Sequence, residues 1–270
     1  MDLVDYTQDA YDKIVDEYED FSSKLDVEDI RFIPISALKG DNVVDRGENM
    51  VWYQGSTLLH TLENIHISSD RNMIDCRFPV QTVIRPHKEE FHDFRGYAGR
   101  IESGIFKVGD EVAVLPSGFT SKVKEIYCDE EKFEEAFPPM SVTLTLEDDI
   151  DISRGDMIVR PHNQATQSQD IDFMMCWMGN EPFNPSKKYT VLHTTNKVRC
   201  IVKEVQYKVD INTLHRMEED KAIRMNDIAR VRIRTTKPLY IDPYTKNRLT
   251  GSIILVDEGS NNTVAAGMII

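Results

Sequence analysis

The spacing of hydrophobic and polar residues changes along the chain, from a helical period to a strand period. Residues 8–25 carry apolar side chains at intervals that fall on one side of an α-helix, and Thr7 before them is a candidate N-cap. Residues 30–35 are typical of a short buried strand, and residues 51–65 repeat the helical spacing. Helix, strand and helix make up only part of an α/β sandwich. We therefore predict that residues 1–66 form an α/β remnant that leaves apolar helix faces exposed.

The stretch from Arg95 to Leu115 is the most informative part of the chain. Glycines interrupt its alternating and β-branched runs at positions 96, 99, 104 and 109. This rhythm predicts strands joined by tight turns at Ser103-Gly104 and Gly109-Asp110. Glycine suits such turns because it reaches positive φ without a Cβ clash.

Short strands separated by turn signals fill the rest of the chain. The first series is predicted at 78–84, 97–103, 105–115, 120–127, 141–146 and 157–160. A polar segment, 161–170, is predicted to be a linker. The second series is predicted at 172–177, 189–193, 198–207, 228–234, 251–256 and 263–269, with a short helix or an ordered loop between 212 and 226.

Strands at this spacing favour barrels, because closure removes exposed strand edges. The predicted fold is mainly β, with two consecutive β-barrels after the α/β remnant. The predicted domains are 1–66, 77–162 and 170–270.

Composition narrows the class of protein. The chain of 270 residues is 40% hydrophobic, yet it has no apolar run near the ~18 residues of a membrane span and no basic start leading into an apolar stretch. A cytoplasmic protein is expected. Its cysteines, Cys76, Cys128, Cys176 and Cys200, form no CxxC pair, which favours reduced thiols over disulfides or zinc ligands.

The charge argues against nucleic-acid binding. The net charge is −14, and residues 1–66 alone contribute 5 − 15 = −10 from their basic and acidic side chains. Binding to a phosphate backbone depends on clustered Lys and Arg that release counterions. We therefore expect neither nucleic acid nor a membrane as a partner.

Two short motifs near the N-terminus suggest guanine recognition. GTPases contact guanine with an Asn-Lys-x-Asp loop, whose aspartate accepts from two ring-edge N–H groups, and with a Ser-Ala-Lys or Ser-Ala-Leu loop, whose backbone N–H donates to O6. Asp2 matches the end of the first loop, and Ser36-Ala37-Leu38 matches the second. Each match alone is weak, but their order and their separation by one helix and one strand strengthen the hypothesis. Asp2, Ser36, Ala37 and Leu38 are the predicted guanine-binding remnant.

No catalytic or metal-binding residue is predicted. His87, Glu89, Glu90 and His92 are metal-ligand types, but their place between two predicted strands favours a solvated loop. The remaining histidines are isolated, and no nucleophile lies in a recognisable arrangement with a base.

Several longer segments resemble a known family. They are Trp52–Leu59, Val205–Leu214, Asn226–Val231, Asp242–Tyr244, Asn247–Gly251 and Thr263–Ile269. On these segments, and on the guanine motifs, the chain resembles the translation-factor superfamily of GTPases over essentially its whole length. Within it, the chain is most similar to the GTPase-bearing large subunit of bacterial sulfate adenylyltransferase (ATP sulfurylase). That family typically has proline where this chain has Ser56.

The resemblance implies a function for the whole subunit. Large subunits of this family pair with a small subunit, which makes adenosine 5′-phosphosulfate and pyrophosphate from ATP and sulfate. GTP hydrolysis by the large subunit, with Mg²⁺, helps to drive this uphill reaction. The groups that catalyse sulfate transfer belong to the small subunit.

The chain departs from the family in one respect. It contains no Gly-x-x-x-x-Gly-Lys-Ser/Thr loop to cradle the phosphates and supply the Mg²⁺ hydroxyl. We therefore interpret it as an N-terminally truncated subunit, expected neither to bind GTP usefully nor to turn it over, and to need no cofactor of its own. The alternatives are a non-enzymatic β-barrel interaction module and a fragment of a translation elongation factor.

Overall fold

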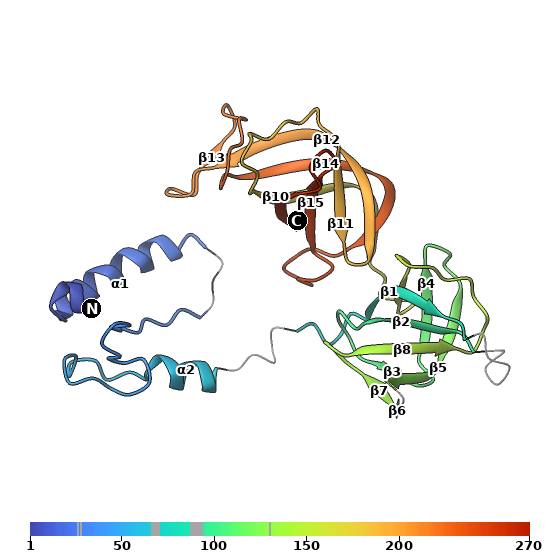
Figure 1. The fold of residues 1–270 in the computed structure, drawn as a ribbon, viewed down its shortest axis with the longest axis horizontal. Helices are drawn as coiled ribbons and strands as arrows, with labels where there is room; N and C mark the ends of the chain where they lie inside the picture. Colours follow the sequence, from blue (N-terminus) through green and yellow to red (C-terminus); the bar gives the residue numbers. More distant parts are fainter. Residues whose placement is uncertain (26, 28, 66–70, 87–93, 130) are drawn as a thin grey trace. The chain divides into compact units, whose positions relative to one another are not determined.

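The computed structural model describes residues 1–25, 27, 29–65, 71–86, 94–129 and 131–270. The chain separates into two compact units, Met1–Asp70 and Arg71–Ile270. Figure 1 shows the short helices of unit 1 in blue, and the strands of unit 2 from green to red. The predicted class, a mainly β protein with consecutive β-barrels, is confirmed.

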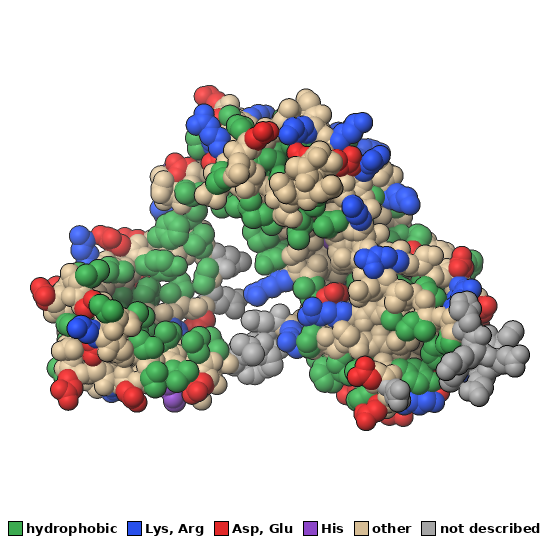
Figure 2. Space-filling model, in the orientation of Figure 1, with side chains coloured by type: hydrophobic (Ala, Val, Ile, Leu, Met, Phe, Trp, Pro, Cys, Tyr) green, Lys and Arg blue, Asp and Glu red, His purple; other side chains and the backbone are tan. Residues whose placement is uncertain are grey.

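Unit 1 contains three short helices among its described residues. They are η1 (Asp2–Val4), α1 (Gln8–Ser22) and α2 (Leu58–Asn64). Thr7 occupies the N-cap position of α1, but its hydroxyl donates to the Val4 carbonyl instead of accepting from the helix. The apolar stripe of α1 remains exposed, with Ile14 at 58% and Tyr18 at 48%. Figure 2 shows such hydrophobic side chains on the visible face of this unit.

The predicted strand at 30–35 does not form. Its backbone carbonyls accept hydrogen bonds from groups other than a neighbouring strand: the Met1 amine binds the Ile35 carbonyl, and the Asn42 side chain binds the Pro34 carbonyl. The Tyr11 hydroxyl donates to Phe32 O at 3.1 Å. The segment is therefore extended without belonging to a sheet.

The predicted helix at 51–65 is shorter than expected, because α2 begins only at Leu58. The Arg46 guanidinium donates to the carbonyls of Gln54 and Gly55, which a longer helix would use. The amides of Leu58 and Leu59 donate to Asn42 and Val43. Trp52 consequently precedes the helix, and its ring nitrogen donates to the Tyr6 carbonyl.

The first barrel of unit 2 is a closed ring of strands. Its order is β4-β9-β1-β2-β8-β5, and a further pairing of β4 with β5 closes it. The strands that this part of the chain contributes are β1 (Arg77–Ile84), β2 (Gly96–Arg100), β3 (Phe106–Lys107), β4 (Glu111–Leu115), β5 (Thr120–Cys128), β6 (Glu131–Phe133), β7 (Glu135–Ala136), β8 (Ser141–Leu146) and β9 (Met157–Val159). β6 extends the ring beyond β5, and β3 pairs separately with β7.

The second barrel closes in the same way. Its ring order is β11-β15-β16-β10-β14-β12, and β11 also pairs with β12. Its strands are β10 (Thr166–Trp177), β11 (Tyr189–His193), β12 (Asn196–Val209), β13 (Arg216–Met217), β14 (Ile228–Ile241), β15 (Ser252–Asp257) and β16 (Thr263–Ile269). Inward side chains such as Phe173, Val191 and Val231 fill its core, as period-2 alternation requires.

The predicted linker at 161–170 is largely wrong. β10 begins at Thr166, and Ala165 packs in an apolar cluster with Tyr240 of the second barrel and Leu115 of the first. A polar composition thus concealed a segment that is part of the contact between the barrels. The predicted domain boundaries remain a prediction, since Arg71–Ile270 is one compact unit.

The glycine turns occur where they were predicted. Gly104 has φ +74°, and a Cβ built there would lie 2.5 Å from Cys76 Cα. Gly109 also has positive φ and separates β3 from β4. The residue at 104 is therefore constrained both by its dihedral angle and by the close approach of the Cys76 backbone, just before β1.

Replacing Gly104 with alanine should destabilise the protein far more than the same change at Gly118. Gly118 has φ +75° but open space around its Cα, so Gly118→Ala isolates the dihedral strain. We expect it to cost about 1 kcal/mol, and Gly104→Ala roughly 3 kcal/mol or more, because a backbone clash is added. Urea unfolding of both variants measures the difference, and equal losses would contradict the account.

Candidate functional site

The structure brings Asp2 and Ser36 into direct contact. Ser36 is buried, and its hydroxyl donates to Asp2 Oδ1 at 2.7 Å. The Met1 amine donates to the Ile35 carbonyl at 2.8 Å, which ties η1 to the extended segment before Ser36. Two of the predicted guanine-binding residues, 34 positions apart in sequence, therefore share one site.

The turn after Ser36 presents backbone donors. The Gly40 amide donates to the Ser36 carbonyl, and the Lys39 amide donates to Ser36 Oγ. Ala37 and Leu38 project outward, with Leu38 82% exposed. Within the described part of the chain, neither of their amides has a hydrogen-bond acceptor.

Neighbouring groups hold Asp2 in its charged form. The hydrogen bond from Ser36 lowers the pKa of the Asp2 carboxyl below its usual value. Burial raises the pKa of the nearby Tyr6 phenol, and the Asp41 carboxylate adds to that effect. An ionised carboxylate beside free amides has the donor and acceptor types that the guanine edge needs.

Next to these guanine-type contacts, the described residues of unit 1 provide no recognisable site for the nucleotide phosphates or Mg²⁺. The sequence carries no phosphate-binding loop, and among the residues that the structure describes no group of His, Cys, Asp and Glu could hold a metal ion. The region of His87, Glu89, Glu90 and His92 lies outside the described residues. The guanine-binding role of Asp2, Ser36, Ala37 and Leu38 remains a prediction.

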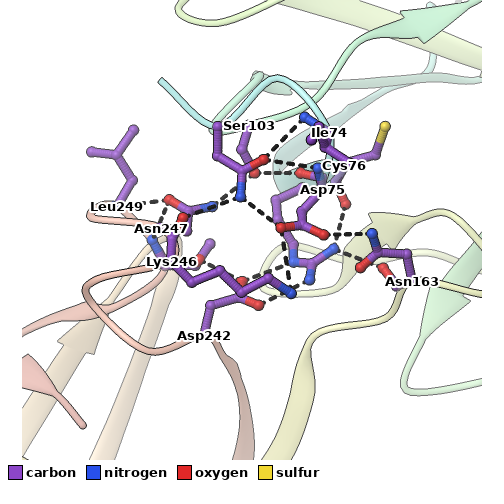
Figure 3. Close-up of polar contacts among 12 residues, drawn as sticks. Ile74, Asp75, Cys76, Ser103, Asn163, Asp242, Lys246, Asn247 and Leu249 are labelled. Atoms are coloured by element: carbon purple, nitrogen blue, oxygen red, sulfur yellow. Dashed lines mark hydrogen bonds and ion pairs between the residues drawn. The ribbon is translucent and has the colours of Figure 1, made fainter. Parts of the chain in front are cut away.

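A second polar site joins the two barrels (Figure 3). Arg77, at the start of β1, is completely buried. Its Nε and Nη2 donate to the two carboxylate oxygens of Asp242, at 2.8 and 2.9 Å, and its Nη1 donates to the carbonyls of Cys76 and Asn163. Asp242 also accepts from the Thr250 hydroxyl at 2.7 Å. Each nitrogen of the guanidinium thus has at least one partner, as a buried charge requires.

Asp75 lies at the centre of a second group of contacts in this polar site, which is called the joint. It accepts from the side chains of Asn72 and Asn163, and Lys246 Nζ lies 3.3 Å away. Burial pushes the pKa of Asp75 upward, but the hydrogen bonds from Asn72 and Asn163 outweigh it, and the pKa falls below its usual value. Asn72 also donates to the Lys246 carbonyl, so the network crosses between barrels by several routes.

Asn247 closes the joint from the second barrel. Its amide donates to the Ser103 hydroxyl at 2.7 Å, and that hydroxyl donates to the Asp75 carbonyl. His193 is also buried, and its Nε2 lies 2.8 Å from the Thr250 carbonyl. Burial lowers the pKa of His193, so the imidazole is held neutral.

Sequence reasoning missed Arg77 altogether. Its partner Asp242 is 165 residues away, and nothing local marks the pairing. The available signal was an arginine placed directly before the apolar residues Phe78, Pro79 and Val80, since a buried arginine demands a counter-charge. Cys76, Cys128, Cys176 and Cys200 are all unpaired in the structure.

Two solved structures share the fold of this chain. Sup35 complexed with GDP superposes with a TM-score of 0.66 at 20% identity, covering 98% of this chain and 65% of that one. Elongation factor SelB from Methanococcus maripaludis, in its apo form, gives 0.60 at 18% identity, covering 78% and 46%. The chain therefore has the fold of these two proteins.

Relatives found by sequence are more similar to this chain than the two solved structures are. The family model of GTP-eEF1A C-terminal domain-like proteins matches residues 170–270. Bifunctional enzyme CysN/CysC of Mycobacterium tuberculosis strain H37Rv is 49% identical over 271 residues, which cover 100% of this chain and 44% of that protein. Sulfate adenylyltransferase subunit 1 of Bacteroides thetaiotaomicron is 47% identical over 278 residues, covering 100% and 56%.

The chain is therefore homologous along its whole length to sulfate adenylyltransferase subunit 1 and to the matching part of CysN/CysC, which confirms the resemblance. It spans about half the length of the curated relatives it matches. None of the helices described in the structure is long and apolar enough to cross a membrane.

Removing the buried cation should be far more damaging than removing an exposed one. Arg77→Met leaves Asp242 as an uncompensated buried charge, and we expect it to cost about 3–5 kcal/mol of unfolding free energy. The exposed Arg232 of β14 pairs with Asp172 of β10. Arg232→Met is therefore the matched control, and we expect it to cost about 1 kcal/mol or less of unfolding free energy. Urea unfolding of both variants tests this, and similar losses would show that the joint contributes little.

Proposed function

We propose that this chain is the partner-docking part of a sulfate adenylyltransferase subunit 1. The observation that carries the proposal is the homology to that subunit across all 270 residues, at 47% identity in the Bacteroides thetaiotaomicron protein. The whole enzyme would make adenosine 5′-phosphosulfate and pyrophosphate from ATP and sulfate on its small subunit. GTP hydrolysis by the complete subunit 1 would drive that step.

The proposed role of the two barrels is structural. We expect the two barrels to keep one relative arrangement, because Arg77 and Asp242 are both buried and satisfy each other's charge. A rigid pair of barrels presents a fixed surface, which lowers the entropic cost of docking a partner. The small subunit is the proposed partner, and no catalytic group is assigned to this chain.

The guanine-type site in unit 1 is proposed to contribute selectivity only in the complete subunit. The Asp2 carboxylate supplies the acceptor oxygens for a base edge, and the amides of Ala37 and Leu38 supply two donors. The energy of nucleotide binding comes largely from the phosphates and Mg²⁺, for which this chain has no loop. GTP and Mg²⁺ are therefore proposed as cofactors of the longer protein, not of this chain.

Two other functions are weaker candidates. A free-standing interaction module would use the same barrels with a different partner. A translation-factor fragment would have to bind tRNA with a chain of net charge −14, and the arginines of β14 are already paired with Asp170 and Asp172. Filter binding with tRNA distinguishes that case from the other two.

The isolated chain should not distinguish GTP from ATP. Titrating each nucleotide in the presence of Mg²⁺, with fluorescent analogues and unlabelled competitors, should show no guanine preference, because the base-edge contacts alone are too few. Guanine-selective binding in the micromolar range, abolished by Asp2→Asn, would contradict this prediction. No GTP turnover above the no-protein control is expected.

Co-expression with the small sulfate adenylyltransferase subunit of the same organism should yield a complex. We expect the two chains to co-elute in size-exclusion chromatography, because the barrel pair carries the docking surface. Folding of the chain is checked by its circular dichroism in the same preparation. Separate elution of two folded proteins would contradict the proposal that these barrels suffice for docking.

A further inference from the structure

A hollow of about 690 Å³ lies where the turn between β11 and β12 meets the first barrel. Its lining includes Arg154, in the loop before β9, and Lys197, Arg199 and Lys237 from the second barrel. Four of its ten lining residues are basic and none is acidic. In a chain of net charge −14, such a wall is an unusual concentration of positive charge.

The geometry of the barrel contact holds Arg154 at this position. Asn196 Nδ2, in the β11–β12 turn, donates to the Gly155 carbonyl at 2.8 Å. Gly155 has φ +98°, and a Cβ there would lie 2.6 Å from Asn196 Oδ1. The Asn196 hydrogen bond therefore holds the loop carrying Arg154 against the turn, and the positive φ at position 155 favours glycine there.

The turn itself is strained and holds unused hydroxyls. Thr194 has φ +48°, which is an outlier for a β-branched residue. The hydroxyl oxygens of Thr194 and Thr195 are buried, and neither has a hydrogen-bond partner among the described residues. Both residues line the hollow. Backbone strain and unsatisfied polar atoms at one point are features that binding sites share.

The cations around the hollow are only partly neutralised. Arg199 Nε donates to Glu258 at 2.9 Å, and Arg154 donates to the Gln81 carbonyl. In the part of the chain that the structure describes, Lys197 and Lys237 take part in no ion pair. Two ammonium groups and two guanidinium groups thus surround a space that contains no carboxylate.

We propose that this hollow binds an oligophosphate, the class of ligand that includes pyrophosphate and the polyphosphate chain of a nucleotide. Guanidinium and ammonium groups bind phosphate oxygens through charge-assisted hydrogen bonds. The volume lies within the ~300–1,000 Å³ of small-molecule sites, which exceeds the needs of a single phosphate. Because the lining comes from both barrels, the occupant contacts both at once.

The test titrates the wild-type chain with pyrophosphate, ATP, phosphate and sulfate at constant ionic strength, by isothermal titration calorimetry. We expect pyrophosphate and ATP to bind more tightly than phosphate and sulfate. The variant Lys197→Gln/Lys237→Gln should weaken pyrophosphate binding by about tenfold or more, since each charge-assisted contact is removed. The matched control is Lys188→Gln/Lys203→Gln, which removes the same charge from exposed lysines that do not line the hollow.

A third variant tests whether the occupant contacts both barrels. Arg154→Gln removes the cation that the first barrel supplies to the hollow, and it should weaken pyrophosphate binding several-fold. Equal weakening in the Lys188/Lys203 control, no change in Arg154→Gln, or equal affinity for sulfate and pyrophosphate would each overturn the proposal. The experiment involves neither the small subunit nor sulfate activation, so its outcome is independent of the proposed function.

Discussion

The buried ion pair between Arg77 and Asp242 is the constraint on which the arrangement of the two barrels depends. Moving a guanidinium out of water is costly, and the cost is offset only while every donor keeps its partner. Sliding or rotating one barrel against the other would break the bidentate contact and leave two charges buried. The joint therefore favours one arrangement, and an apolar cluster that includes Ala165, Tyr240 and Leu115 also connects the two barrels. The hollow lined by Arg154 and Lys197 exists only because that arrangement is held.

Sequence patterns predicted the barrels well because the forces that form strands are local. Alternation identified β8 and β11 to the residue, and glycine placed the turn at Gly104. The helix at 51–65 was predicted too long because the Arg46 guanidinium donates to backbone carbonyls that a helix would need. The spacing of apolar residues does not reveal such a contact. The joint was missed for a different reason: Arg77 and Asp242 meet only after both barrels have closed.

The candidate guanine site was partly predictable. The contact between Asp2 and Ser36 follows from motif order, and the structure brings the two side chains together. The free amides of Ala37 and Leu38 could not be deduced from sequence, since they depend on how the turn closes on the Ser36 carbonyl. The four basic residues of the hollow could not be grouped from the sequence either, because β12, β14 and the loop before β9 supply them from distant positions.

The central claim is that the buried joint makes the two barrels one cooperative unit. Native-state hydrogen exchange measures this directly, by comparing the most protected amides of β1 in the first barrel with those of β14 in the second. The account predicts the same opening free energy in both strands, within about 0.5 kcal/mol, because neither barrel opens without the other. Opening free energies that differ by more than about 2 kcal/mol would show that the barrels unfold separately, and would contradict it.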